Sequence, residues 1–286
     1  MKIQKPRFVL TLSCPDQPGI VAAISACLGK QDCNITDSAQ FGDPDSGRYF
    51  MRVSFSAPAA LSHEQIEAAF QPIFARFKMA AKINDLEKRP RAVILVSRFG
   101  HCLNDLLYRH RIGALPIEIP AIISNHRDFY QLAASHDIPF HHLPVTAETK
   151  TRQERKLLEL VEEENADFVV LARYMQILSD ELCGELAGRA INIHHSFLPS
   201  FKGARPYHQA YKRGVKLVGA TAHYVTADLD EGPIIEQEAV RVDHAMSADD
   251  LVAAGRDIES LVLARAVKWH AEHRVLVNGH RTVVFR

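Results

Sequence analysis

Two short motifs in the second half of the chain carry an amide, an imidazole and a carboxylate. The amide and the imidazole, Asn192 and His194, begin the stretch of residues 192–201. The carboxylate, Asp230, stands in the turn-rich segment 229–232. An amide can donate to a developing oxyanion, an imidazole can carry a proton, and a carboxylate can orient that imidazole. Acyl transfer to or from an amide nitrogen needs these three roles, so we interpret the residues as a reaction centre.

The spacing of Asn192 and His194 predicts that both side chains address one substrate atom. Residues 190–193 have the apolar pattern of a buried strand, in which side chains two positions apart project to the same side. Pro199 fixes its own φ and restricts Leu198, which predicts a rigid loop after the strand.

These motifs resemble a known family. Asn192-Ile-His-His-Ser-Phe-Leu-Pro199, Gly219-Ala-Thr-Ala-His-Tyr-Val225 and Asp230-Glu-Gly232 are similar to 10-formyltetrahydrofolate-dependent formyltransferases, and most of all to formyltetrahydrofolate deformylases. His195 favours the deformylases, because glycinamide ribonucleotide formyltransferases usually have Pro at this position. The resemblance covers essentially the whole chain.

The resemblance implies a hydrolase that uses water and 10-formyltetrahydrofolate, releases formate and tetrahydrofolate, and needs no cofactor. The formate would supply purine synthesis, and the reaction would balance one-carbon pools. Asn192, His194 and Asp230 would be catalytic, with Asp230 either orienting His194 or ordering the water. The expected substrate-binding residues stand at a strand end, in a segment similar to the family's pterin pocket, and beside the reaction centre: Ser97, Met175, Gln176, Leu178, His195 and His223.

Three other functions remain open from the sequence. A formyltransferase to a small amine would use the same centre, and so would a regulatory protein whose catalytic half is inactive. A metal hydrolase would use His194, His195, His223 and Asp230 as ligands. No His-x-x-x-His or similar chelating pair supports this set of ligands, so we expect no metal.

The loop of residues 97–103 disfavours acceptors that carry a phosphate. Related enzymes with ribonucleotide substrates hold the phosphate on a glycine-rich loop, where backbone N–H groups converge. Here Gly100 stands alone between the bulky Phe99 and His101. This difference favours water as the acceptor, and His101 and Cys102 are expected to pack at a helix start.

Composition excludes several partners and indicates a compartment. The formal net charge is +0 and the pI is about 7.3, which disfavours nucleic acid as a partner. The cysteines number 5 and lack Cys-x-x-Cys spacing, as is typical of reduced thiols in a cytoplasmic protein. Neither a signal peptide nor a membrane-spanning run is evident, so no membrane association is expected.

Residues 1–86 are expected to form a separate regulatory or oligomerisation domain. Their pattern is strand, helix, strand, strand, helix, strand, the split βαβ order, and it resembles an ACT domain. Asp16, Pro18, Gly19 and Ile20 at the first strand-to-helix turn are the candidate effector residues, because amides at a helix N-terminus can hold a carboxylate. Glycine or methionine would be the effector, or the turn only shapes a docking domain. ACT-like modules pair edge to edge, so we expect a homotetramer.

After a charged linker at residues 87–91, residues 92–286 are expected to form the catalytic domain. Apolar strands alternate with amphipathic helices, which predicts an α/β fold with a doubly wound, mostly parallel sheet. Ligands bind beyond the carboxyl ends of such strands, where Ser97 and His194 stand. A long helix from about residue 247 to 273 and a hairpin around Asn278-Gly279 would complete this domain.

Overall fold

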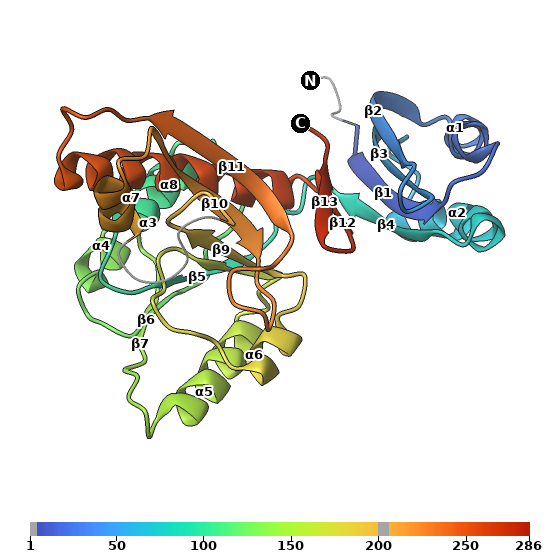
Figure 1. The fold of residues 1–286 in the computed structure, drawn as a ribbon. Helices are drawn as coiled ribbons and strands as arrows, with labels where there is room; N and C mark the ends of the chain where they lie inside the picture. Colours follow the sequence, from blue (N-terminus) through green and yellow to red (C-terminus); the bar gives the residue numbers. More distant parts are fainter. Residues whose placement is uncertain (1–4, 200–205) are drawn as a thin grey trace. The chain divides into compact units, whose positions relative to one another are not determined.

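The computed structural model describes residues 5–199 and 206–286, so Ser200 and Phe201 of the predicted rigid loop lie outside the described residues. The chain divides into two compact units. The first holds residues up to 89 together with 272–278 and 283–286, and the second holds residues 90–271 and 279–282. Figure 1 shows the elements of both units.

The first unit has the predicted split βαβ order. Its elements are β1 (Arg7–Pro15), α1 (Ile20–Lys30), β2 (Asn34–Asp43), β3 (Arg48–Ser56), α2 (His63–Phe77) and β4 (Ala80–Asp85). The four strands form an antiparallel sheet in the order β2-β3-β1-β4. Apolar side chains of the strands pack with Ile24, Leu28, Ile66 and Phe70 of the helices to form the core of this unit.

Local sequence signals set the helix boundaries in the first unit. Helix α2 begins with the predicted capping box, in which the Ser62 side chain accepts from the Gln65 amide and the Gln65 side chain accepts from the Ser62 amide. Helix α1 follows Gly19, whose φ of 96° lies in the left-handed region that glycine adopts without strain.

The C-terminal segment corrects the expected domain division. Residues 272–278 and 283–286 group with the first unit, not with the second. Arg52 of β3 is only 4% exposed, and its Nη2 donates to the Glu272 carbonyl at 3.1 Å. Asn278 donates to Asp43 Oδ2 at 2.7 Å. A buried guanidinium needs acceptors, and residues far along the chain supply one here. The hairpin of β12 (Val275–Asn278) and β13 (Arg281–Val284) forms as predicted.

The second unit is a seven-stranded sheet in the order β11-β10-β9-β8-β5-β6-β7. The five strands from β9 to β7 run parallel, and β10 is antiparallel to both neighbours. The strands are β5 (Ala92–Val96), β6 (Ile122–Ser124), β7 (Phe140–His142), β8 (Phe168–Leu171), β9 (Ala190–His194), β10 (Leu217–Tyr224) and β11 (Ile234–Arg241). The short strand β7 was not predicted, since its three residues are only partly buried and carry no clear apolar pattern.

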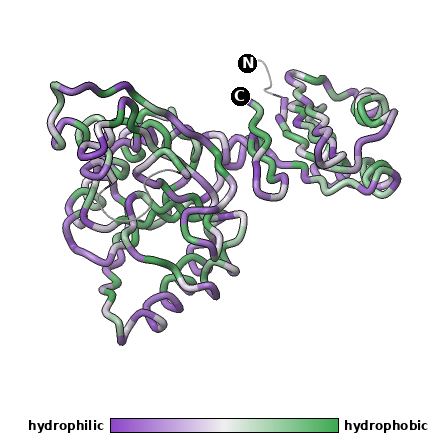
Figure 2. The backbone as a smooth tube through the Cα atoms, in the orientation of Figure 1, coloured by the Kyte–Doolittle hydropathy of each residue, from purple (hydrophilic) through white to green (hydrophobic). Residues whose placement is uncertain are grey.

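Helices cover both faces of this sheet, with α3 and α8 on one face and α5 and α6 on the other (Figure 1). The helices are α3 (His101–Arg111), α4 (Tyr130–Ala134), α5 (Lys150–Glu163), α6 (Asp180–Glu185), α7 (Pro206–Arg213) and α8 (Ala248–Ala271). Helix α5 is mostly hydrophilic (Figure 2), and its apolar residues Leu157, Leu160 and Val161 are buried, as expected for a helix with one buried face.

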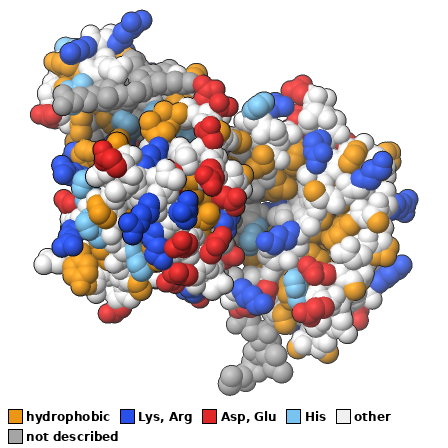
Figure 3. Space-filling model, turned by 90° about the horizontal axis from the view of Figure 1, so that it is seen from below, with side chains coloured by type: hydrophobic (Ala, Val, Ile, Leu, Met, Phe, Trp, Pro, Cys, Tyr) orange, Lys and Arg blue, Asp and Glu red, His pale blue; other side chains and the backbone are white. Residues whose placement is uncertain are grey.

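The distribution of charged side chains and the character of the helices agree with the zero net charge and with the lack of a membrane-spanning run in the sequence. On the face drawn in Figure 3, basic and acidic side chains are interspersed. Among the helices of the described residues, none combines the length and the apolar character that a bilayer crossing needs.

Candidate active site

The end of β9 brings Asn192 and His194 to the pocket as the strand pattern predicted, and both line it. The antiparallel register of β10 then places Thr221 opposite His194 and His223 opposite Asn192. Strand pairing thus brings His223, which is distant along the chain, to Asn192 at the pocket.

Asp230 lies beside His194, with 3.2 Å between the carboxylate Oδ2 and the imidazole Nδ1. The carboxylate can only accept, so Nδ1 carries the proton and Nε2 presents a lone pair. Nε2 is buried and has no hydrogen-bond partner within residues 5–199 and 206–286. Burial raises the pKa of Asp230, but its interactions with His194 and His223 outweigh burial and hold that pKa below the usual value.

The turn that carries Asp230 is tight. Asp230 has a φ of 58°, which aspartate tolerates better than most residues. A Cβ at Gly232 would lie 1.7 Å from the Tyr224 carbonyl oxygen, so only glycine allows this approach. Close packing of the turn against the end of β10 therefore holds the carboxylate at the histidines.

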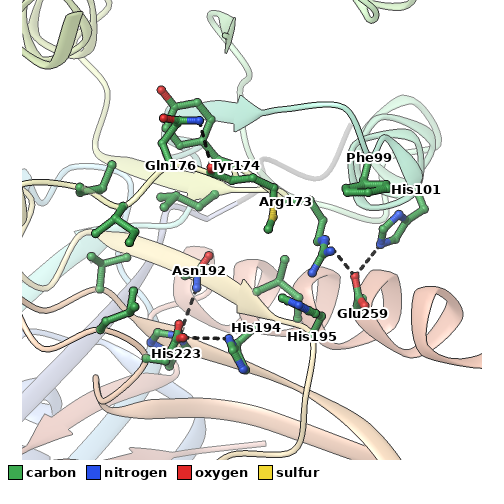
Figure 4. Close-up of a pocket in the computed structure, with 18 of the residues that line it drawn as sticks. Phe99, His101, Arg173, Tyr174, Gln176, Asn192, His194, His195, His223 and Glu259 are labelled. Atoms are coloured by element: carbon green, nitrogen blue, oxygen red, sulfur yellow. Dashed lines mark hydrogen bonds and ion pairs between the residues drawn. The ribbon is translucent and has the colours of Figure 1, made fainter. Parts of the chain in front are cut away.

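His223 orients the amide of Asn192. The His223 Nδ1 lies 2.8 Å from the Tyr224 carbonyl oxygen, which accepts its proton. In the neutral ring, Nε2 then accepts from the Asn192 amide nitrogen at 3.2 Å (Figure 4). The amide nitrogen carries a second N–H, which can donate to an oxygen of the substrate.

The pocket has a volume of about 800 Å³, within the range of ~300–1,000 Å³ typical of small-molecule sites. Met175, Gln176 and Leu178, which were expected to bind the substrate, line it, and so do the apolar residues Leu171 and Val225. An aromatic ring system fits such a lining, and the neighbouring cluster around Asn192 supplies the polar groups.

A second polar cluster stands in the same pocket, around Glu259 of α8. This side chain is 1% exposed. Its Oε2 lies 2.7 Å from His101 Nε2 and 3.4 Å from Arg173 Nε, and its Oε1 accepts from the Tyr207 hydroxyl at 2.8 Å. Burial raises the pKa of Glu259, but the His101 bond and the Arg173 charge lower it more, so the carboxylate stays ionised. We call these four residues the Glu259 cluster.

His195 stands between the two clusters. Its ring centroid lies 5.2 Å from that of His194 and 6.4 Å from that of Tyr207. Burial, together with the charges of Arg173 and His194, lowers the pKa of His195 to about 4. His195 is therefore neutral at physiological pH.

Ser97 does not contact the pocket, contrary to expectation. It is 2% exposed and does not line the cavity. Its hydroxyl donates to Asn125 Oδ1 at 2.7 Å and accepts from the Met175 amide at 2.9 Å. Both hydrogen-bonding capacities are used inside the protein, so Ser97 holds the segment that carries Met175.

The loop after β5 is filled by side chains. A Cβ at Gly100 would lie 2.2 Å from the Phe129 ring, so this glycine accommodates packing. His101, expected to pack at a helix start, lines the pocket and binds Glu259 instead. Cys102 packs as predicted, with its thiol pKa raised by burial.

The candidate effector residues of the first unit occupy the β1 to α1 turn. Asp16, Pro18 and Gly19 are exposed, and α1 has no side-chain cap on its first N–H groups. Ile20 differs from the expectation, because its side chain is buried in the core of the unit. Only the backbone of Ile20 is therefore suited to ligand contact.

The described residues contain one group of possible metal ligands, His101, Cys102 and Glu259. It differs from the four ligands that the metal-hydrolase alternative requires. The Arg173 guanidinium lies 3.4 Å from Glu259, and burial keeps the Cys102 thiol protonated. Both features oppose a bound cation.

Sequence reasoning missed Arg173, Tyr207 and Glu259. The available signal was Glu259 itself, an acidic residue on the apolar face of α8 between Ile258 and Val262. A charge at such a position is rarely buried without partners. The identities of those partners depend on the tertiary structure.

Two family models match the chain. A formyl transferase model matches residues 90–267, and an ACT domain model matches residues 8–60.

The chain is similar to known proteins over almost its full length. The chain is 51% identical to a formyltetrahydrofolate deformylase of Corynebacterium sp. (strain P-1), over 99% of both proteins. It is 48% identical to that of Bacillus subtilis (strain 168), over 96% of this chain and 93% of the relative.

Solved structures of a formyltetrahydrofolate deformylase and of a glycinamide ribonucleotide transformylase are also similar to this chain. The formyltetrahydrofolate deformylase of Burkholderia mallei is 53% identical with a TM-score of 0.94, and the match covers 98% of this chain and 100% of that one. Glycinamide ribonucleotide transformylase 1 of Symbiobacterium toebii is 32% identical with a TM-score of 0.66, over 69% of this chain and 95% of that one.

Proposed function

Since the chain belongs to the formyltetrahydrofolate deformylase family of hydrolases, we propose that it hydrolyses 10-formyltetrahydrofolate to formate and tetrahydrofolate at the Asn192, His194 and Asp230 cluster. The observation that carries this assignment is the His194 imidazole, whose Nδ1 faces Asp230 and whose Nε2 has no partner in the described structure.

In the first step a water oxygen attacks the formyl carbon while His194 Nε2 accepts a proton from the water. The carbonyl oxygen becomes negative and accepts from the free N–H of Asn192, where one oriented donor contributes ~3 kcal/mol. Asp230 stabilises the imidazolium that forms, as its contact with Nδ1 allows. Orienting His194 is therefore the role that the geometry supports for Asp230.

In the second step the C–N10 bond breaks and His194 returns its proton to N10. Tetrahydrofolate leaves, and the formic acid loses its proton to give formate. The apolar lining near Met175 and Leu178 would hold the pterin ring. Neutral His195 and the side chain of His223 would shape the site of the attacking water.

Water as the acceptor is supported by the Glu259 cluster. In this part of the pocket Glu259 accepts from Tyr207 and is held by His101 and Arg173. An amine acceptor would need a free carboxylate or carbonyl to hold its N–H groups, and this carboxylate is already engaged. The amine formyltransferase is therefore disfavoured.

The direct test is to incubate the purified protein with 10-formyltetrahydrofolate alone and to measure formate and tetrahydrofolate. We expect equimolar products without any added amine. Turnover that requires an amine would contradict the hydrolase, and equal turnover in Asn192→Ala would place the reaction elsewhere.

We further propose that the first unit binds a small amino acid, glycine or methionine, at the exposed amides that begin α1. Calorimetric titration of each amino acid into wild type and Gly19→Val tests this proposal.

We also propose that the protein is a homotetramer. Nine of the ten residues of the edge strand β2 are not buried, which supports edge-to-edge pairing. Light scattering tests the homotetramer, and a monomeric mass would contradict it. The formate released by the reaction would supply purine synthesis, and the free cysteines support a cytoplasmic location.

A further inference from the structure

Arg173 is a buried cation whose hydrogen-bonding groups are not all used. Its side chain is 9% exposed, and its Nε and Nη1 atoms have no hydrogen-bond partner among the described residues. Glu259 lies 3.4 Å from Nε and balances the charge. Buried donors without partners are costly, so an acceptor from outside the protein is expected at this position.

Two neighbours hold Arg173 in position, the Glu259 carboxylate and the Phe99 ring. The guanidinium lies over the Phe99 ring, 5.4 Å from its centroid, and Phe99 also lies near the exposed Arg256, at 5.9 Å. All three residues line the pocket. The described lining residues include two carboxylates, of which Asp230 lies at His194 and His223 and Glu259 lies at Arg173. Two guanidinium groups therefore face one carboxylate at this end of the pocket, and the excess positive charge favours an anion.

The same end of the pocket adjoins the reaction centre. Glu259 binds both Arg173 and Tyr207, the Tyr207 ring faces His195, and His195 neighbours His194. Figure 4 shows Arg173 and Glu259 on one side of His195, and Asn192 and His194 on the other. An anion at Arg173 would therefore sit inside the cavity in which the C–N bond breaks.

We infer that Arg173 forms a subsite for a small carboxylate, and that formate released from the substrate occupies it. This inference rests on the proposed hydrolysis for the identity of the anion. A carboxylate accepts from a guanidinium with charge-assisted hydrogen bonds, which neutral water cannot match. The glutamate tail of the folate offers the same chemistry, and the experiment separates the two sources.

The test is saturation-transfer NMR on the formate proton, with sodium formate and the free protein. It needs no turnover, so its outcome does not depend on the proposed function. We expect saturation with wild type and at least an approximately tenfold weaker affinity with Arg173→Met, since a charge-assisted contact is lost. The control is Arg109→Met, which removes an arginine paired with Asp105 outside the pocket lining and is expected to bind formate as wild type does.

Arg173→Lys retains the charge beside Glu259 and serves if Arg173→Met does not fold. We expect at least threefold weaker formate binding from it, because an ammonium lacks the planar fork. Formate binding unchanged in Arg173→Lys, or in a folded Arg173→Met, would overturn the subsite.

Kinetics with 10-formyltetrahydrofolate and with its analogue lacking the glutamate tail separate the two carboxylates. If formate is the ligand, Arg173→Met raises the inhibition constant of formate and changes KM equally for both substrates. A KM increase confined to the substrate with the tail, together with no formate binding to wild type, would assign Arg173 to the tail and overturn the inference.

Discussion

Two pairs of histidine and carboxylate line one pocket, and they differ in which atoms remain available. In His194 and Asp230 the imidazole Nε2 has no partner among the described residues. In His101 and Glu259 both carboxylate oxygens are engaged, by His101, Tyr207 and Arg173. A group that moves protons must have a free atom, whereas a group that holds other side chains in place is saturated. This difference supports the proposal that the first pair carries out the chemistry and that the second pair holds other side chains in place.

The largest expected effect is on stability, from removal of the saturated carboxylate. Glu259→Ala leaves Arg173 buried without its counter-charge and should cost about 3–5 kcal/mol. Thermal unfolding should shift down by about 10 °C. The matched control is Glu238→Ala, which removes a surface partner of Arg265 and should cost less than ~1 kcal/mol. Equal melting temperatures for the two variants would break the comparison.

His194→Ala should abolish proton transfer and lower kcat by about 10³-fold, which corresponds to ~4 kcal/mol. Formate release under saturating substrate measures this effect. His136→Ala removes a partly buried histidine outside the pocket lining and should retain wild-type turnover. A His194 variant within tenfold of wild type would show that the unpartnered nitrogen is not the base.

Asn192→Ala should lower kcat by about 10²-fold, or ~3 kcal/mol, because the lost donor contacts the oxygen that becomes negative. KM should change little, since that contact strengthens only in the transition state. A rise in KM at constant kcat would instead indicate that Asn192 binds the ground state.

Asp230→Asn should cost ~2 kcal/mol of stability at neutral pH, because the ionised carboxylate is held by His194. The pKa of Asp230 is depressed in the folded state, so its contribution is complete above the unfolded pKa of ~3.9 and is lost as the pH falls through the folded value. Urea titrations of both proteins at neutral and acidic pH should show the difference shrinking toward low pH. A difference independent of pH would contradict the stabilisation of the ionised Asp230 carboxylate by His194.

The smallest expected effect is that of Tyr207→Phe, which removes one of the hydrogen bonds to Glu259 and should cost ~1 kcal/mol. Gly255 is packed against the Tyr207 ring, so the ring itself should stay in place. Tyr130→Phe is the control, since that ring is exposed and its hydroxyl makes no contact needed by the cluster. Denaturant unfolding distinguishes the two variants.

Much of the fold could be predicted because its signals are local. The βαββαβ order, the capping box at Ser62 and the parallel strands follow from periodicities and caps that act over a few residues. The weak strand β7 and the grouping of residues 272–278 with the first unit could not be predicted. The first lacks an apolar pattern, and the second depends on contacts such as that of Arg52 with residue 272.

The amino-acid sequence by itself determined the candidate chemistry of this protein. Asn192 and His194 share one strand face, and Asp230 lies in a segment whose residue types predict a turn. Only the tertiary structure decided that His223 orients the amide, that Ser97 faces inward, and that Glu259 is saturated while His194 is not. The physical reason is that the partners of a buried donor or acceptor come from distant segments of the chain. The order of the strands and the packing of the helices determine which segments lie beside each side chain.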